Sequence, residues 1–163
     1  MNKKEAIKCL DLIHGLKYRQ DIIQAFAKTI GLDPNWSYQQ LRAHLDGVDL
    51  TPYADENVLQ LEQRHLAGKH ASLLNGDHQQ MRQQRFALEA GLDVTLLSGT
   101  WRQMDEQRLA LEDGLDATLL HGTWKQMKEQ RLALQAGLDA TLLHGSYLQM
   151  NEQRIKMLEV RGE

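Results

Sequence analysis

The side chains best placed to bind charged groups are four arginines that recur at a fixed spacing of 23 residues. They are Arg85, Arg108, Arg131 and Arg154. Each lies on or beside the apolar stripe of a predicted helix, where a guanidinium needs a partner because an unpaired buried charge is costly. The repeated aspartates that could pair with them are Asp93, Asp116 and Asp139. We favour such a structural ladder, or arginine stems that cover tryptophan faces; the alternative is a row that grips phosphates or acidic side chains.

Aromatic residues recur with the same spacing, at the first position of each predicted long helix. They are Trp101, Trp124 and Tyr147. Packing between neighbouring repeats is the usual role of such residues, and we favour it here. If they were exposed along one edge, they could instead anchor a protein interface or stack on nucleic-acid bases.

Two histidines, His121 and His144, keep the same spacing and precede a glycine. A histidine at the C-terminal end of a helix interacts favourably with the helix dipole. The pair lacks a third ligand nearby, and the spacing of His65, His70 and His78 fits no zinc motif, so we expect no metal site. His121 and His144 remain candidate binding residues beside the arginines and the aromatic residues.

The sequence contains no recognised catalytic or cofactor-binding motif, such as a phosphate-binding glycine loop, a nucleophile elbow or a zinc-protease helix. Its single cysteine, Cys9, excludes a disulfide framework and a cysteine-based zinc site. Carboxylates are spread over helical faces of mixed charge, so no acid–base pair stands out. We therefore expect a protein that is not an enzyme and uses no cofactor. A pocket in which titratable side chains converge away from the repeats' contacts would argue for catalysis.

The composition is that of a globular chain without a strong charge bias. The 163 residues are 42% hydrophobic and 25% charged, with a formal net charge of −3. Phosphate neutralisation normally needs clustered lysine and arginine, so this charge disfavours a nucleic-acid partner. No apolar run approaches about 18 residues, which predicts no membrane span. The charged start of the chain lacks a secretory signal, so we expect the cytoplasm.

These side chains belong to a tandem repeat. The segment 99–104 recurs as 122–127 and 145–150, each time followed by Glu-Gln-Arg and preceded by Gly-Leu-Asp and a pair of leucines. A fourth copy ends at Arg85, and a shorter fifth copy includes residues 62–64. Fainter echoes continue toward the N-terminus. A repeat of this kind predicts supersecondary units that stack on one another.

Each unit is predicted to form one long helix and one short helix. Thr100 can cap the long helix, and Gln103 can return a bond to the Thr100 amide. Gly114 can end the helix in the left-handed conformation. Asp116 then caps a short helix that ends at Gly122. Two glycines per unit beside capping residues exclude one continuous helix, and the small number of β-branched residues disfavours strands.

The predicted long helix has one apolar face that includes an arginine. Four residues share this face: Trp101, Met104, Arg108 and Leu111. Three lie on the opposite face: Gln103, Glu106 and Ala110. One unit cannot bury the apolar face alone, whereas stacking on its neighbours can. The predicted fold is all-α, an α-solenoid-like array of 23-residue long-helix/short-helix repeats with a helical N-terminal cap.

We divide the chain into an N-terminal helical region, residues 1–55, and the repeat array, residues 56–163. The helices predicted in the first region cover about 3–13, 18–30 and 37–45. Residues 33–36 form a turn at Pro34, and residues 49–53 form the joint to the array. The N-terminal region could be the cap of the array or a separate small domain. We favour the cap.

Stacked repeats present an extended surface more often than a catalytic pocket. We therefore expect a binding or adaptor protein that engages a protein partner through a groove or an edge of the array, with self-association as a further expectation. The alternative is a nucleic-acid-binding regulatory protein that uses the N-terminal helices and the repeated arginines. Its N-terminal candidates are Tyr18, Arg19, Lys28 and Arg42. An enzyme is the third hypothesis.

Overall fold

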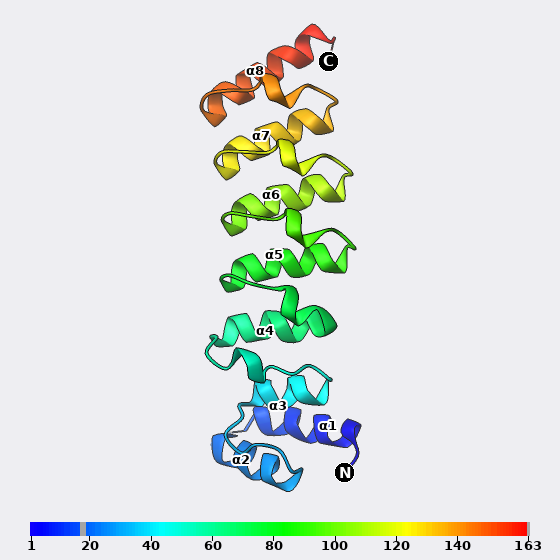
Figure 1. Cartoon of the computed structure of the whole chain (residues 1–163), viewed down its shortest axis with the longest axis vertical. Coiled ribbons are helices and arrows are strands. Elements are labelled where there is room, and N and C mark those ends of the chain that lie inside the picture. Colours follow the sequence, from blue (N-terminus) through cyan, green and yellow to red (C-terminus); the bar gives the residue numbers. More distant parts are fainter. Residues whose placement is uncertain (17–18, 163) are drawn as a thin grey trace. The chain divides into compact units, whose positions relative to one another are not determined.

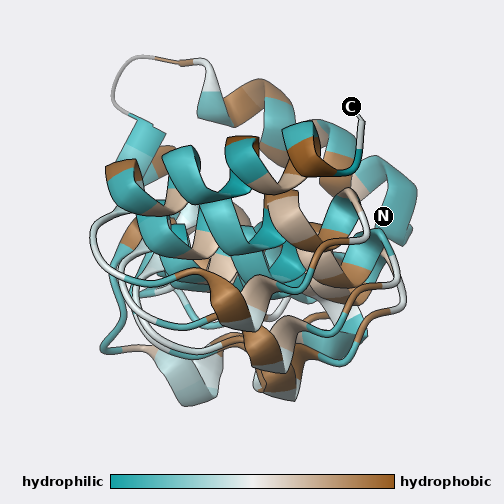
Figure 2. Cartoon of the chain, turned by 90° about the horizontal axis from the view of Figure 1, so that it is seen from above, coloured by the Kyte–Doolittle hydropathy of each residue, from teal (hydrophilic) through white to brown (hydrophobic). Residues whose placement is uncertain are grey.

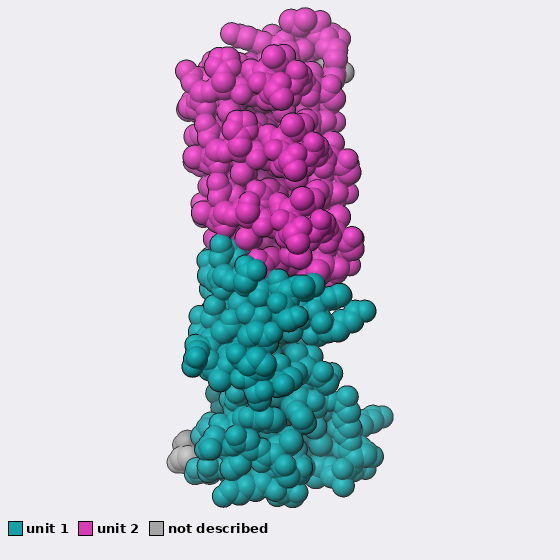
Figure 3. All heavy atoms as spheres, viewed as in Figure 1, with its two compact units in different colours: residues 1–81 teal, residues 82–163 magenta. Residues whose placement is uncertain are grey.

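The computed structural model describes residues 1–16 and 19–162, and every regular element in these ranges is helical. They contain eight α-helices, five 3-10 helices and no strand, so the predicted all-α class is confirmed. By compactness the chain divides into two units, residues 1–81 and residues 82–163 (Figure 3). The boundary predicted at residue 55 rests on where the repeats begin, and it stays a prediction. None of the helices in the described ranges combines the length and apolar character that crossing a membrane requires.

Unit 1 begins with three helices at the predicted places. They are α1 (Lys3–His14), α2 (Arg19–Thr29) and α3 (Tyr38–Leu45). Residue 18, where the second helix was predicted to begin, lies outside the described residues. Helix α1 packs against α2 and α3 (Figure 1), and its Leu10 is buried together with Ile23 and Leu41.

The predicted turn at residues 33–36 is confirmed, because the Trp36 N–H donates to the Asp33 carbonyl at 3.1 Å. The predicted joint, residues 49–53, contains a single 3-10 turn. The remaining elements of unit 1 are η1 (Thr51–Tyr53), α4 (Val58–Ala67) and η2 (Gly68–Leu73). Helix α5 (His78–Glu89) begins in unit 1 and ends in unit 2.

In unit 2, long helices alternate with single turns of 3-10 helix, as Figure 1 shows. The long helices are α6 (Trp101–Glu112), α7 (Trp124–Gln135) and α8 (Tyr147–Val160). The turns are η3 (Val94–Leu96), η4 (Ala117–Leu119) and η5 (Ala140–Leu142). The predicted short helix is therefore only one turn, and it stands out as hydrophobic in Figure 2. Leu120, predicted inside it, has extended backbone and is buried.

The ends of the long helices agree with the predicted capping. Thr100 accepts from the Gln103 N–H at 3.2 Å, while Gln103 accepts from the Thr100 N–H at 2.8 Å. At the other end Gly114 has a φ of +71°. The Gly114 N–H donates to the Leu111 carbonyl at 3.0 Å, and the Leu115 N–H donates to Ala110 at 2.9 Å. These two bonds are the Schellman motif, and they satisfy carbonyls that the helix end would leave unpaired.

The long helix is buried on the face opposite its apolar stripe as well. Glu106 and Ala110, which lie on that opposite face, are only 5% and 0% exposed. Met104 packs with Ala87 and Leu97 of the preceding copy, whereas Ala110 packs with residues of the following copy. A helix with neighbours on two sides buries two faces, and a single-helix projection cannot show the second.

Gly114 and Gly122, the glycines on either side of η4, allow a comparison of two substitutions that tests the capping geometry. Gly122 and Gly114 both have positive φ, but only at Gly122 would an added Cβ lie 2.3 Å from the Gln126 Oε1. We expect Gly114→Ala to lower the free energy of unfolding by about 1–2 kcal/mol through backbone strain alone. Gly122→Ala would in addition displace the Gln126 amide, which accepts from the Thr123 N–H and donates to the Gly145 carbonyl. We expect each of these two lost hydrogen bonds to add about 1 kcal/mol to the loss. Urea denaturation measures both, and equal losses would contradict this account.

Candidate functional site

The repeated arginines bind across the contacts between consecutive long helices, which we call the seams. The Arg131 Nε lies 2.6 Å from the Glu106 Oε2, and the Arg154 Nε lies 3.0 Å from the Glu129 Oε2. In the preceding seam the Arg108 Nε donates to the Gln83 Oε1 at 2.9 Å. These side chains are mostly buried, so the pairs are poorly screened by water. The structural role of the arginines therefore has direct support in the geometry.

The predicted arginine–aspartate ladder was wrong in its acidic partner. The Asp116 Oδ1 accepts from the Thr118 N–H at 3.0 Å and from the Thr118 hydroxyl at 2.5 Å. The hydrogen bond from this hydroxyl, and then the backbone bond, lower the pKa of Asp116. The same bonds to Thr95 lower the pKa of Asp93. These repeated aspartates thus cap the 3-10 turns. The seam partners of Arg131 and Arg154 are glutamates, whereas Arg108 pairs with Asp105 and Glu112 of its own helix.

The tryptophan rings are likewise not covered by the arginines that we predicted to cover them. Arg102, which is not one of the four repeated arginines, lies over Trp101 and Trp124. Of the four, Arg85 and Arg108 lie near the ring of Phe86, at 4.8 and 5.4 Å from its centre. The Arg85 Nη1 also lies 2.6 Å from the Glu89 Oε1 within its own helix.

Two glutamines of each copy complete the seams. Gln103, besides capping its own helix, donates to the Gly122 carbonyl of the next copy at 2.7 Å. Gln130 accepts from the His121 N–H at 2.9 Å and is fully buried. In the described part of the chain, no buried side-chain nitrogen or oxygen is without a partner. The repeated Glu-Gln-Arg sequence is thereby explained as three contacts to neighbouring copies.

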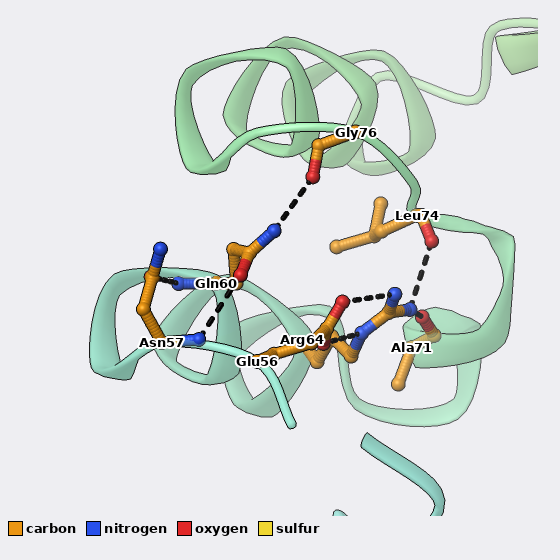
Figure 4. A network of polar contacts seen from close by, with 7 residues as sticks. All are labelled: Glu56, Asn57, Gln60, Arg64, Ala71, Leu74 and Gly76. Atoms are coloured by element: carbon orange, nitrogen blue, oxygen red, sulfur yellow. Dashed lines mark hydrogen bonds and ion pairs between the residues drawn. The ribbon is translucent and has the colours of Figure 1, made fainter. Parts of the chain in front are cut away.

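Unit 1 contains a related arginine that our candidate residues did not include. Arg64, in the shortened fifth copy, is 5% exposed and sits 3.7 Å above the Tyr53 ring. Its Nη1 donates to the Ala71 and Leu74 carbonyls at 2.7 and 2.8 Å, and the guanidinium also pairs with Glu56 (Figure 4). The bond to Glu56 raises the pKa of Arg64 against the effect of burial. The Glu-Gln-Arg sequence at residues 62–64 makes Arg64 the equivalent of the repeated arginines, and it could have identified this residue.

The aromatic residues of unit 2 alternate with cations in a row that we call the aromatic–cation edge. It consists of Trp101, Arg102, Trp124, Lys125 and Tyr147. The Arg102 Cζ lies 5.2 Å from the centres of both tryptophan rings. The Lys125 Nζ lies 5.7 Å from the Trp124 ring and 4.8 Å from the Tyr147 ring. Each cation therefore bridges the aromatic residues of two consecutive copies.

The aromatic–cation edge is accessible and positively charged. Arg102 and Lys125 are exposed, the tryptophans are half-buried, and Tyr147 is 37% exposed. Among the described residues no carboxylate forms an ion pair with either cation. The edge also contains the first turns of three helices, where the helix dipole favours negative charge. A ligand that suits this row carries acidic groups beside apolar ones.

The two candidate histidines are exposed and lie beside the 3-10 turns. The Nδ1 atoms of His121 and His144 lie 3.3 and 3.1 Å from the Leu119 and Leu142 carbonyls. Each histidine thus bonds the carbonyl two residues before it. Within residues 1–16 and 19–162, no group of three histidine, cysteine or acidic side chains is arranged to hold a metal ion.

A pocket in unit 1 brings together titratable side chains that the sequence gave no reason to connect. It has a volume of about 550 Å³. Its polar lining residues are His14, Tyr38, Gln39, Arg42, Asp46, Glu62 and His65. They come from α1, α3, α4 and the residue that follows α3, with no common spacing. Such convergence away from the seams is the feature that we named as favouring catalysis.

Hydrogen bonds link most of these pocket residues into one network. The His65 Nε2 lies 2.6 Å from the Asp46 Oδ2, and Arg42 pairs with both Asp46 and Asp11. Burial alone would raise the pKa of Asp46, but the bonds from His65 and Arg42 hold it below its usual value. Burial, and then the bond to Asp11, raise the pKa of the Tyr38 phenol. Asp46 is therefore held as an anion and Tyr38 as a neutral donor.

The seam geometry predicts different costs for two equivalent arginines. Arg131→Ala leaves the buried Glu106 carboxylate without its partner, so we expect a loss of about 2–3 kcal/mol in the free energy of unfolding. Arg108→Ala leaves the neutral Gln83 amide in the seam, together with Asp105 and Glu112 of its own helix, whose side chains are 35% and 34% exposed and can be hydrated. The loss should therefore be about half as large. Arg102→Ala, on the exposed edge, serves as the control, because it removes only exposed cation–π contacts and should change stability by less than about 1 kcal/mol. Equal losses for Arg131→Ala and Arg102→Ala in urea denaturation would contradict the role of the seam.

Comparison with known proteins yields no matching protein family, no similar curated protein and no similar solved structure. A functional argument for this chain therefore rests on its own residues, above all on the aromatic–cation edge of unit 2 and the pocket of unit 1.

Proposed function

We propose that this protein is a non-enzymatic binding or adaptor protein, built as an α-solenoid-like array of 23-residue repeats, that engages a protein partner. The array is supported by contacts that recur from copy to copy. The bond from Gln103 to the Gly122 carbonyl repeats from Gln126 to Gly145, and the ion pair of Arg131 with Glu106 repeats one copy later. Units that bond their neighbours in this way form extended surfaces.

The observation that carries the binding proposal is the alternation of aromatic rings and unpaired cations along the aromatic–cation edge. Tryptophan, tyrosine and arginine are the residues that contribute most to protein interfaces. The seam arginines, in contrast, are occupied by Glu106 and Glu129 and are poorly placed to receive a ligand. We therefore assign binding to the edge and structure to the seams.

The partner that fits this edge is an extended protein segment with acidic residues alternating with apolar ones. Its carboxylates would pair with Arg102 and Lys125, and its apolar side chains would pack on the accessible parts of the rings. Such complementarity gives specificity and fast association. Tyr147, the most exposed of the three rings, would be the principal anchor.

Nucleic acid has less support as the partner. Base stacking needs a free aromatic face, and cations already lie over Trp101, Trp124 and Tyr147. Of the N-terminal candidates, Arg42 pairs with Asp11 and Asp46, Arg19 donates to the His14 carbonyl, and Tyr18 lies outside the described residues. The net charge of −3 also disfavours phosphate binding.

Catalysis also has less support, although the pocket of unit 1 meets the criterion of converging titratable groups. Arg42 is neutralised by two carboxylates, and His65 is held by one of them. Among the described lining residues the possible nucleophiles are carboxylates, imidazoles and a phenol, and of these Asp46 and His65 already bind each other. We assign binding to this pocket as well.

Selection from a displayed library of random dodecapeptides tests the proposal for the aromatic–cation edge. We expect enriched peptides to combine acidic and apolar residues. Their affinity, measured by fluorescence polarisation on synthetic copies, should fall about ten-fold or more for the double variant Arg102→Glu/Lys125→Glu, and it should weaken with salt.

The matched control for this experiment is Lys156→Glu, an equal charge reversal at an exposed position of α8 outside the edge. It should leave peptide affinity within about two-fold of the original protein. Single-stranded RNA and DNA oligonucleotides serve as competitors. The proposal would be contradicted if no peptide were enriched, or if the enriched peptides bound the double variant as tightly as the original protein. It would also be contradicted if oligonucleotides displaced the bound peptides.

A further inference from the structure

The pocket of unit 1 has an unbalanced negative charge. Three carboxylates belong to it or to its network, those of Asp11, Asp46 and Glu62, against the guanidinium of Arg42 and an imidazole, His65, that is positive only when protonated. Arg42 is shared between two of them. The Glu62 carboxylate is exposed and forms no ion pair with any described residue. A ligand that carries a positive charge would balance it.

The hydrogen-bonding groups at this end of the pocket are mainly acceptors. A carboxylate can only accept, so the His65 Nε2 donates to Asp46 at 2.6 Å. In the neutral imidazole this leaves the His65 Nδ1 as an acceptor. Gln39 faces the Val58 carbonyl and the Glu62 N–H, and with the amide nitrogen assigned to the side of the carbonyl both of its polar atoms are satisfied. A primary ammonium, with three donors, complements Glu62 and His65 together.

Apolar side chains continue from this end along the pocket wall. Val58 lies one helical turn before Glu62 and Leu66 one turn after it, and both line the pocket. A second cavity of about 210 Å³ shares Val58 with the first, and it is also lined by Ile23 and Leu61. Together they offer an apolar track that begins next to the acceptors.

The orientation of a ligand follows from the charge at the far end. Arg19 lines the second cavity and donates to the His14 carbonyl at 3.3 Å. Its guanidinium would repel an ammonium group there. The positive group of a ligand is thus confined to the end with Glu62 and Asp46, and its hydrocarbon part points toward Ile23.

We propose that this pocket binds a primary alkylamine, with the ammonium group between Glu62 and His65 and the hydrocarbon chain along Val58 toward Ile23. The combined volume lies in the range of small-molecule sites. This site is separate from the aromatic–cation edge, so its existence does not depend on the function proposed for unit 2.

A series of three probes with the same chain tests the proposal: hexylamine, hexan-1-ol and hexanoate. Binding is followed by calorimetry and by the methyl resonances of Val58 and Ile23. We expect hexylamine to bind saturably and to shift both sets of methyl resonances, hexan-1-ol to bind about ten-fold more weakly, and hexanoate to show no saturable binding. Equal affinity of the three probes would mean that the pocket is merely an apolar hollow and would overturn the proposal.

Two glutamate variants test where the ammonium group of the bound amine lies. Glu62→Gln should weaken hexylamine binding about ten-fold while leaving the weak binding of hexan-1-ol unchanged. Glu152→Gln, the same change at an exposed position of α8, is the control and should leave both affinities unchanged. Both positions are exposed, so we expect the variants to fold, and far-ultraviolet circular dichroism checks this. If the two variants bind hexylamine equally, the ammonium position assigned here is wrong.

Discussion

The structure of unit 2 depends on the cost of placing charged side chains between consecutive helices. Glu106 is 7% exposed in its side chain and Arg131 is 12% exposed, so each has lost most of its water and requires the other. The two residues come from different copies and are 25 positions apart. A helix that moved out of register would leave both charges unpaired. The ion pair thus specifies the alignment of consecutive copies more than it adds to their stability.

The glutamines extend this constraint from the seams to the helix ends. Gln126 accepts from the Thr123 N–H and donates to the Gly145 carbonyl, so one amide closes its own helix and fixes the start of the next copy. The close approach of its oxygen explains why Gly122 has no side chain. Local capping and the spacing between copies are therefore coupled through the same residues.

This coupling decides what could be predicted from the sequence. The helix ends were predictable because caps such as Thr100 and Gly114 act within a few residues. The partner of Arg131 was not, since Glu106 lies on a face that a single helix would leave in solvent and that is buried only by the next copy. The pocket of unit 1 was not predictable either, because Asp46 and His65 share no spacing and meet only through the packing of α3 and α4.

The differences between copies indicate where the repeats are free to vary. Glu-Gln-Arg is identical in the last three copies, and apart from the exposed Glu152 of the last copy these residues contact neighbouring copies. The position after the first aromatic residue changes from Arg102 to Lys125 to Leu148, and all three side chains are exposed. A seam residue must pair with a buried residue of a neighbouring copy, whereas an edge residue is exposed and its type is freer to change. The edge therefore differs chemically from copy to copy, so the partner that we propose would be recognised in a single register along it.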